Sequence, residues 1–356
     1  MMSLLHPTRP DAPHLTSLHP LAALPGGSFE LTGTHLLSSR NDQGSRLPSV
    51  FLGETEAGLD LLRPNRAQVR VPEGAIASDL ILRYGTQASN ALHANVAVPM
   101  TEDLHMISNP AVDLDGNLFA MISGPRGTRV PVSIMRISRD LQARPFVRDL
   151  LNVSALAFGP DGYLYASSRA EGIIYRISPE GAVSTFAEGM GLATGIAFDK
   201  EGNLFVGDRS GTIFKLGPHG RHNAAEIFVF ATLEPSVAAY HLAFRDDGIL
   251  LVTAPTTSSH QAIHAIDPDG TARVFFRGLG RPQGMALDTD GNVYVAASLG
   301  GRRGIVRVGA NGASAELVVS GNDLVGLCFT EDGYAALATA GTLYQVDLGI
   351  TGRILV

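Results

Sequence analysis

The stretch ALAFGPDGYLYAS, residues 155–167, decides the fold, because it joins two short apolar strands through an acidic turn that closes on glycine. Aspartate braces such a turn through side-chain to backbone hydrogen bonds, and glycine takes the positive φ angle that closes the hairpin. The same turn recurs at Asp113–Gly116, Gly159–Gly162, Asp199–Gly202, Arg245–Gly248, Asp288–Gly291 and Thr330–Gly333. The closing glycines are 46, 40, 46, 43 and 42 residues apart, which indicates an internal repeat.

Each repeat is predicted to hold four strands, most clearly at residues 155–158, 163–167, 172–177 and 182–186. A repeat of this length with four strands is typical of a propeller blade, and the 3.6-residue periodicity of a helical repeat is absent. We therefore predict a six-bladed β-propeller over residues 99–356. A serial stack of sandwiches is the alternative, but equal units without long linkers favour radial closure, which leaves only short, protected edges.

How the predicted ring closes stays open at this point. Residues 352–356 resemble the fourth strand of the earlier repeats. Closure could instead rest on side-chain packing, or on the stretch 95–100 joining the edge of a sheet.

Residues 15–98 lack the repeat and are predicted to form a separate all-β unit with the size of a small sandwich, after an amino-terminal tail over residues 1–14. Its short motifs are Leu18–Pro20, Pro25–Gly27, Leu31–Thr34, Phe51–Gly53, Val71–Gly74 and Ser89–Asn90. In this order they resemble the IPT/TIG family of immunoglobulin-like domains. The resemblance implies a spacer or interaction module and no chemistry in this part. The predicted fold class is thus all-β, a small immunoglobulin-like sandwich followed by a six-bladed propeller.

Composition excludes several classes of protein. Hydrophobic residues make up 45% of the chain and charged residues 17%, so the chain can bury a core and is not disordered. A net charge of -7 argues against a general nucleic-acid binder. The single cysteine, Cys328, has no internal disulfide partner and is expected to pack as a small hydrophobe.

Two further expectations concern location. No run of about 18 apolar residues exists, so we expect no membrane span. Residues 1–9 have neither the basic start nor the apolar stretch of a signal peptide, and a cytoplasmic protein is therefore expected.

Two pairs of segments within the repeats resemble a known family, namely residues 193–198 with 202–208 and residues 281–288 with 291–296. They resemble the six-bladed propellers with NHL repeats and the gluconolactonase/regucalcin (senescence marker protein) family. For that family the resemblance implies a divalent metal, often calcium, at the mouth of the central channel. Glutamate, asparagine and aspartate would hold it where the innermost strand of each blade begins.

This chain departs from the family at those strand entrances. Aligning the repeats on their turn glycines places Ser108, Ser154, Thr194, Tyr240, Gln283 and Val325 there. The family's Glu-Gly-Pro motif is here Ser108–Pro110, its Pro-Asn-Gly motif Ala193–Gly195 and its Pro-Asp-Gly motif Pro282–Gly284. Because hard cations need several oxygen ligands, usually with carboxylate charge, we expect no metal and no cofactor.

A rearranged metal site that includes His241 or Asp208 is the enzymatic alternative, and calcium or another divalent metal would then serve a lactone or ester hydrolase. His241 follows Tyr240 at a strand entrance, but a packed, hydrogen-bonded histidine is the stronger expectation. The sequence has no cysteine pair, HExxH, GxSxG or Walker-type loop, which removes the commonest zinc, serine-hydrolase and nucleotide sites. Catalysis is left undecided.

Charge placement points to a ligand instead. The recurring turns are acidic, whereas the loops after the second strand of each repeat carry Arg126, Arg129, Arg169, Arg209, Arg302 and Arg303 against only Glu171 and Asp208. A solvated charged surface is the alternative, because adding the links between repeats reduces the excess to eight arginines against six carboxylates. Arginine presents a rigid fork of donors suited to carboxylate or phosphate, so a partner is expected to be a small anionic ligand or an acidic protein surface. Within the loop 123–131, Arg126 and Arg129 mark the best contact region.

The leading interpretation is therefore a binding propeller with a degenerate gluconolactonase-type site. Its expected contact residues are Ser108, Ser154, Thr194, Tyr240, His241, Gln283, Arg126, Arg129, Arg209 and Arg303. A third interpretation is a protein-interaction scaffold that takes no small molecule.

Overall fold

The computed structural model describes residues 12–37, 47–217, 226–258, 261–330 and 333–353. These residues form strands, turns and loops without an α-helix, so the all-β prediction is confirmed. Within the described ranges no helix is long and apolar enough to cross a membrane. The chain divides into two compact units, Met1–Val98 with Val318–Asn322, and Pro99–Leu317 with Asp323–Val356.

The first unit holds two antiparallel sheets around one hydrophobic core. Its strands are β1 (His14–His19), β2 (Ala22–Ala23), β3 (Ser28–Thr34), β4 (Ser49–Leu52), β5 (Thr55–Arg63), β6 (Arg66–Arg70), β7 (Ser78–Tyr84), β8 (Gln87–Ala88) and β9 (Leu92–Val96). One sheet has the order β1-β3-β6-β5, and in the other β4 pairs with β5 and β7, which pairs in turn with β8 and β9.

The core of this unit follows from strand alternation. Buried and half-buried residues alternate along β3, as expected for a strand with one face in a core. Phe29 and Leu31 from that strand pack with Val50 and Leu82 of the other sheet. The short segment Val318–Asn322 belongs to this unit because Val319 and Ser320 pair in parallel with β2.

The second unit is a β-propeller built from successive antiparallel strands. They are β10 (Val98–Thr101), β11 (Ala111–Val112), β12 (Leu118–Met121), β13 (Ile134–Ile137), β14 (Ala143–Val147), β15 (Val153–Phe158), β16 (Leu164–Ser168), β17 (Ile173–Ile177), β18 (Val183–Ala187), β19 (Ala193–Phe198), β20 (Leu204–Asp208), β21 (Thr212–Leu216), β22 (Ile227–Thr232), β23 (His241–Phe244), β24 (Leu250–Thr253), β25 (Gln261–Ile266), β26 (Ala272–Gly280), β27 (Met285–Leu287), β28 (Val293–Leu299), β29 (Arg302–Val308), β30 (Ala315–Ser320), β31 (Leu324–Phe329), β32 (Tyr334–Thr339) and β33 (Leu343–Asp347).

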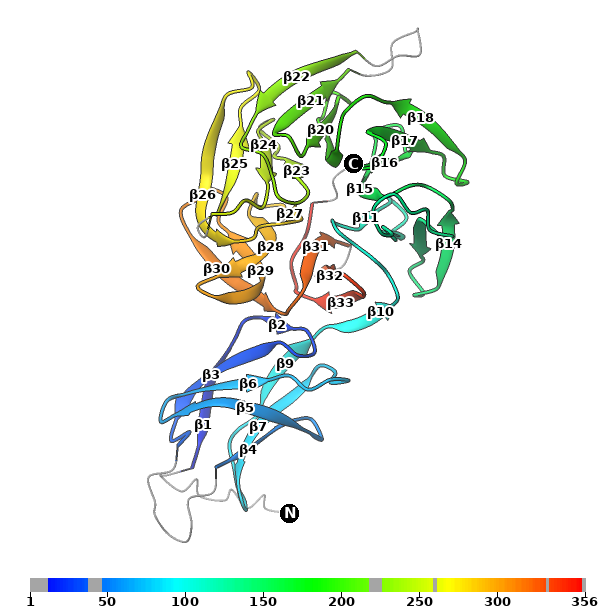
Figure 1. The fold of residues 1–356 in the computed structure, drawn as a ribbon. Helices are drawn as coiled ribbons and strands as arrows, with labels where there is room; N and C mark the ends of the chain where they lie inside the picture. The colour runs from blue at the N-terminus through cyan, green and yellow to red at the C-terminus, as the bar shows by residue number, and fades with distance from the viewer. Residues whose placement is uncertain (1–11, 38–46, 218–225, 259–260, 331–332, 354–356) are drawn as a thin grey trace. The chain divides into compact units, whose positions relative to one another are not determined.

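Pairing within the propeller follows chain order. The strands β11–β14, β15–β18 and β19–β22 form three separate four-stranded sheets, and β31–β33 form a fourth together with β10. Consecutive pairing continues from β23 to β26 and again from β27 to β30. In Figure 1 the sheets are set around a centre, with β11, β15, β23 and β31 among the innermost strands.

The acidic turns have the chemistry predicted for them. Asp113, Asp199 and Asp288 each accept a hydrogen bond from the backbone nitrogen of the asparagine four residues later, at 2.7, 2.8 and 2.8 Å. Gly116, Gly202 and Gly291 have φ angles of 77, 82 and 80°. Glu331 and Asp332 of the last turn lie outside the described residues.

Ring closure uses the stretch that precedes the repeats. Strand β10 pairs beside β33 at the edge of the last sheet, so residues 98–101 supply its fourth strand. Gly352 instead forms an isolated bridge with Asp288, and Arg353 donates its backbone hydrogen bond to the carbonyl of Leu287 at 2.9 Å. The fourth-strand prediction for residues 352–356 is therefore wrong for Gly352 and Arg353, and residues 354–356 lie outside the described part.

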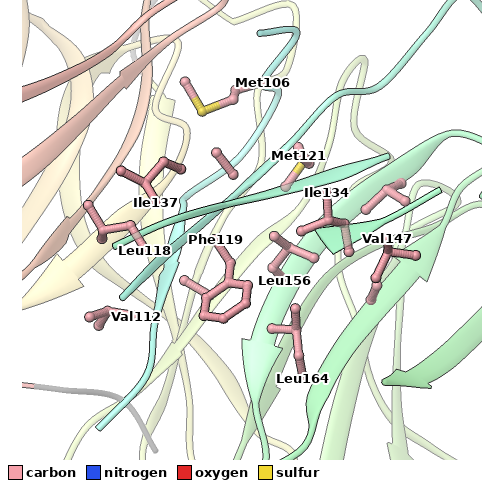
Figure 2. Packing of buried hydrophobic residues seen from close by; sticks show 14 of the residues in the cluster. Met106, Val112, Leu118, Phe119, Met121, Ile134, Ile137, Val147, Leu156 and Leu164 are labelled. Atoms are coloured by element: carbon pink, nitrogen blue, oxygen red, sulfur yellow. The ribbon is translucent and has the colours of Figure 1, made fainter. Parts of the chain in front are cut away.

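Neighbouring sheets bury apolar side chains against each other. Figure 2 shows this packing between the sheet of Leu118 and Phe119 and the next sheet, which contributes Leu156 and Leu164. The Phe119 ring meets the ring of Phe158 edge to face at 5.2 Å between centroids. Such aromatic pairs add about 0.5–1.5 kcal/mol beyond their burial, so packing between neighbouring sheets stabilises the propeller.

Candidate functional site

The innermost strands enclose the channel on which the predicted site depends. Strand β11 contacts β15, and the contacts continue through β19, β23 and β27 to β31, which contacts β11 again. Each of these strands begins at one end of the channel and leads into an acidic turn at the other end. The predicted contact residues lie at the first end, here called the entrance end.

Ser108 and His241 close the channel near the entrance end. They come from opposite parts of the ring, and the Ser108 Oγ lies 3.2 Å from the His241 Nδ1. Both side chains are buried. Burial lowers the pKa of His241 to about 3, so the imidazole is neutral at pH 7 and a poor general base there.

Asn109, the neighbour of Ser108, completes this closure and was not predicted as a site residue. Its Nδ2 donates to the carbonyl of Met285 at 2.7 Å, and its Oδ1 accepts from the backbone nitrogen of Leu327 at 3.1 Å. A Cβ at Gly284 or Gly326 would come within 2.0 or 2.4 Å of that oxygen. The only usable signal was the pair of glycines, which stand at matching positions in two successive repeats.

Ser154 and Thr194 form hydrogen bonds between neighbouring sheets. The Ser154 Oγ donates to the carbonyl of Ala193 at 3.0 Å. The Thr194 Oγ1 donates to the carbonyl of Gly207 at 2.9 Å and accepts from the backbone nitrogen of Tyr240 at 3.0 Å. Both side chains are buried, so their polar atoms already have partners within the protein.

Tyr240 and Gln283 also form hydrogen bonds with backbone carbonyls of the protein. The Tyr240 hydroxyl donates to the carbonyl of Glu234, and burial raises the pKa of this tyrosine to about 12. The Gln283 Nε2 donates weakly to the carbonyl of Leu324 at 3.4 Å. A ligand role for these residues stays a prediction, and their visible contacts are structural.

No metal centre is assembled by these residues. In the described ranges there is no group of three or more histidine, cysteine, aspartate or glutamate side chains that could hold a metal ion. Asp208, the carboxylate considered for a rearranged site, accepts from the backbone nitrogen of Leu192 at 2.8 Å and from the Ser210 hydroxyl. The neutral donor set around Ser108 and His241 does not suit a hard cation such as calcium.

The predicted arginines differ in how they are held. Arg129 donates to the carbonyl of Asp149 at 2.5 Å and pairs with Glu171 at 3.5 Å. Arg209 donates to the carbonyl of Val237 at 3.2 Å, while Arg126 and Arg303 are exposed. Of these four, only Arg129 has a carboxylate partner in the described part of the chain.

Three arginines from successive loops come close together. Arg169 is half-buried, and burial followed by the charges of Arg209 and Arg126 lowers its pKa. None of the three forms an ion pair with a described carboxylate. We call Arg126, Arg169 and Arg209 the arginine trio.

The backbone around the arginine trio is fixed by one buried asparagine. The Asn152 Oδ1 accepts from the nitrogen of Gly127 at 2.7 Å, and its Nδ2 donates to the carbonyls of Gly124 and Pro125 at 2.8 and 3.0 Å. The Asn152 carbonyl accepts from the nitrogen of Arg169 at 3.3 Å. One residue thus positions the loop of Arg126 and the start of the loop of Arg169.

Comparison of the sequence with protein-family models and with curated proteins finds no match. Solved structures do match. A gluconolactonase from Xanthomonas campestris is 16% identical with a TM-score of 0.58, covering 71% of this chain and 89% of that chain. A luciferin-regenerating enzyme is 16% identical with a TM-score of 0.56, covering 73% and 98%.

An auxiliary nutrient binding protein from Bacteroides thetaiotaomicron is 11% identical with a TM-score of 0.52, covering 96% of this chain and 98% of that chain. These neighbours include enzymes and a binding protein, so they speak for fold and not for activity. The chain has the β-propeller fold of gluconolactonase-like proteins.

Proposed function

We propose that this chain is a six-bladed propeller preceded by an IPT/TIG-like immunoglobulin sandwich, and that it binds a small anionic ligand without catalysing its conversion. Six successive groups of strands and the ring of contacts among the six innermost strands support the blade number. The two sheets around one core over residues 15–98 support the sandwich.

The arginine trio carries the ligand proposal. Arg169 is a half-buried cation whose pKa is lowered by burial and by the charges of Arg209 and Arg126, and a bound anion would offset this unfavourable arrangement. Guanidinium groups present several N–H donors in a fixed plane, which suits carboxylate, sulfate or phosphate oxygens. The loops are held by Asn152, so part of the ordering cost of binding is already met.

Hydrolysis has weaker support. Ser108 and His241 are within hydrogen-bond distance, but the imidazole has a pKa of about 3. A base that weak holds almost no driving force for taking a proton from serine at neutral pH. The side chains at the strand entrances are neutral and form hydrogen bonds with protein backbone. Among the described residues, no group of three or more histidine, cysteine, aspartate or glutamate side chains could hold a metal ion.

The test is thermal unfolding and calorimetric titration with sulfate, phosphate and citrate. A ligand bound only by the native state should raise stability by about 2.7 kcal/mol at one hundred times its Kd. Arg169→Gln should weaken binding by about tenfold or more, because a charged hydrogen bond contributes about 1.5–3 kcal/mol. Arg144→Gln, the same change on the exposed outer strand β14, is the matched control.

Without ligand, Arg169→Gln should be at least as stable as the natural chain, since it removes a half-buried cation that the charges of Arg126 and Arg209 disfavour. Equal anion binding by both variants, or no binding at all, would contradict the proposal. An acidic protein surface as partner would instead leave small anions without effect, and the double change Arg126→Glu with Arg303→Glu would weaken its capture. A saturable stabilisation of chelator-treated protein by calcium, magnesium, manganese or zinc would favour the hydrolase.

A further inference from the structure

The channel opens into a cavity on the side of the acidic turns, away from the arginine trio. The cavity has a volume of about 490 Å³ and is lined by all six innermost strands. Ser108, Asn109 and His241 line its closed end, whereas Ser154, Thr194, Tyr240 and Gln283 are not among its lining residues. Its size falls within the roughly 300–1,000 Å³ of typical small-molecule sites.

Away from the acidic turns, the side chains that line the cavity are mainly apolar. Its walls include Leu156, Ile196, Leu242, Met285 and Leu327. Six phenylalanines also line it, namely Phe158, Phe198, Phe205, Phe230, Phe244 and Phe329. Because these side chains carry no hydrogen-bonding groups, water inside gains little.

The titratable groups at the closed end and in the wall are neutral. Burial lowers the pKa of His241 to about 3 and raises the pKa of Cys328 to about 12. Both therefore stay uncharged at neutral pH. A charged ligand group would have no opposite charge to meet in this part of the cavity.

Charges occur only towards the acidic turns, and most of them are already paired. Asp246 pairs with Arg353 at 2.8 Å, Asp247 with Arg245 at 3.1 Å, and Glu201 with Lys200 at 3.9 Å. Asp199 accepts from Asn203, and the Lys215 Nζ lies 5.4 Å from the Phe205 ring centroid. Among the described residues of the lining, four carboxylates stand against four cations, so this part of the opening has no excess of either charge.

We propose that this cavity is a second binding site, independent of the arginine trio, that takes an uncharged, largely apolar small molecule of aromatic or alicyclic type. Apolar walls supply the driving force, and the phenylalanines of the lining favour a flat or ring-shaped ligand. The closed end provides only the Ser108 hydroxyl and the neutral imidazole as polar neighbours.

Cys328 reports on occupancy, because it is the single cysteine of the chain and lines the cavity. The natural protein is treated at pH 9 with a small neutral thiol reagent in the presence of increasing concentrations of naphthalene. Mass spectrometry then follows the rate at which one reagent molecule is added to the chain. We expect naphthalene to slow the modification saturably, by about fivefold at four times its Kd. The charged analogues 2-naphthoate and (2-naphthylmethyl)trimethylammonium, which both keep their charge at pH 9, should require at least about tenfold higher concentrations, since their charge would be desolvated.

A variant locates the site. Ala157→Phe places a ring in the cavity wall and should abolish protection, whereas Ala143→Phe, the same change on the exposed outer strand β14, should leave it intact. Protection measured in the natural protein keeps the test valid if Ala157→Phe does not fold.

Three results would overturn the proposal. The first is the absence of saturable protection by naphthalene, and the second is stronger protection by either charged analogue. The third is that protection appears only after residues 354–356 are deleted, which would make this chain's own carboxyl-terminal segment the occupant.

Discussion

Replacing Asn109 by alanine should destabilise the propeller well beyond the effect of an ordinary surface change. The side chain satisfies the carbonyl of Met285 at 2.7 Å and the backbone nitrogen of Leu327 at 3.1 Å, and both of those residues are fully buried. Each buried backbone group left without a partner costs about 1–3 kcal/mol. Water from the adjoining cavity can meet part of this loss, so the expected decrease in the free energy of unfolding is about 2–4 kcal/mol.

Urea unfolding, followed by circular dichroism, measures this difference. Asn322→Ala is the control because Asn322 is exposed and its side chain forms no hydrogen bond with a described residue, and its effect should stay within about 0.5 kcal/mol. A decrease below about 0.5 kcal/mol for Asn109→Ala would refute the reasoning that this residue joins the strands β27 and β31.

Three further predictions concern single sites. Because of His241, the free energy of unfolding should fall as the pH is lowered, since this histidine binds a proton near pH 6.5 in the unfolded chain but only near pH 3 in the native chain. His241→Gln should therefore remove about 2.5 kcal/mol of the decrease in the free energy of unfolding between pH 6 and pH 4. Urea titrations in which the variant loses as much stability over this range as the natural chain would contradict this. Gly352→Ala should destabilise by about 1–3 kcal/mol, because its Cβ would lie 1.8 Å from that of Phe329, whereas Gly341→Ala, with open space around it, should not alter the melting temperature. Because burial raises the pKa of Cys328 to about 12, its thiol should react with thiol reagents about a thousandfold more slowly than a free cysteine at pH 8. The rate should rise about tenfold per pH unit up to pH 11. A rate that levels off near pH 9 would show that the thiol is not buried.

The repeat and its strands could be predicted because their signals are local. The strands expected at 155–158, 163–167, 172–177 and 182–186 are observed at Val153–Phe158, Leu164–Ser168, Ile173–Ile177 and Val183–Ala187. Alternation and turn chemistry act over a few residues and are visible in the sequence itself. The position of β10 beside β33 was only one of several open options, because that pairing joins segments more than two hundred residues apart.

The candidate site was harder to predict, because its contacts are long-range. Aligning the repeats places Ser108 at one strand entrance and His241 directly after another, at Tyr240. It does not show that the two side chains meet across the channel, 133 residues apart. Asn109 was missed for the same reason, since its partners lie 176 and 218 residues away. Arg169 is predicted only as one of several basic loop residues, while its partial burial and the influence of Arg126 and Arg209 on its pKa depend on how three successive sheets are placed.

The closure formed by Ser108, Asn109 and His241 has a consequence for both binding proposals. The closure lies between the entrance end, where the three cationic side chains of the arginine trio are found, and the cavity. A ligand at one end therefore does not touch a ligand at the other. Coupling between two sites requires that each ligand distinguish two states of the protein, and the hydrogen bonds of Asn109 hold this region in one arrangement. Arg169→Gln should therefore leave the naphthalene protection of Cys328 unchanged within about twofold, and Ala157→Phe should leave anion binding equally unchanged. A larger reciprocal effect would mean that the closure has two states and transmits binding along the channel.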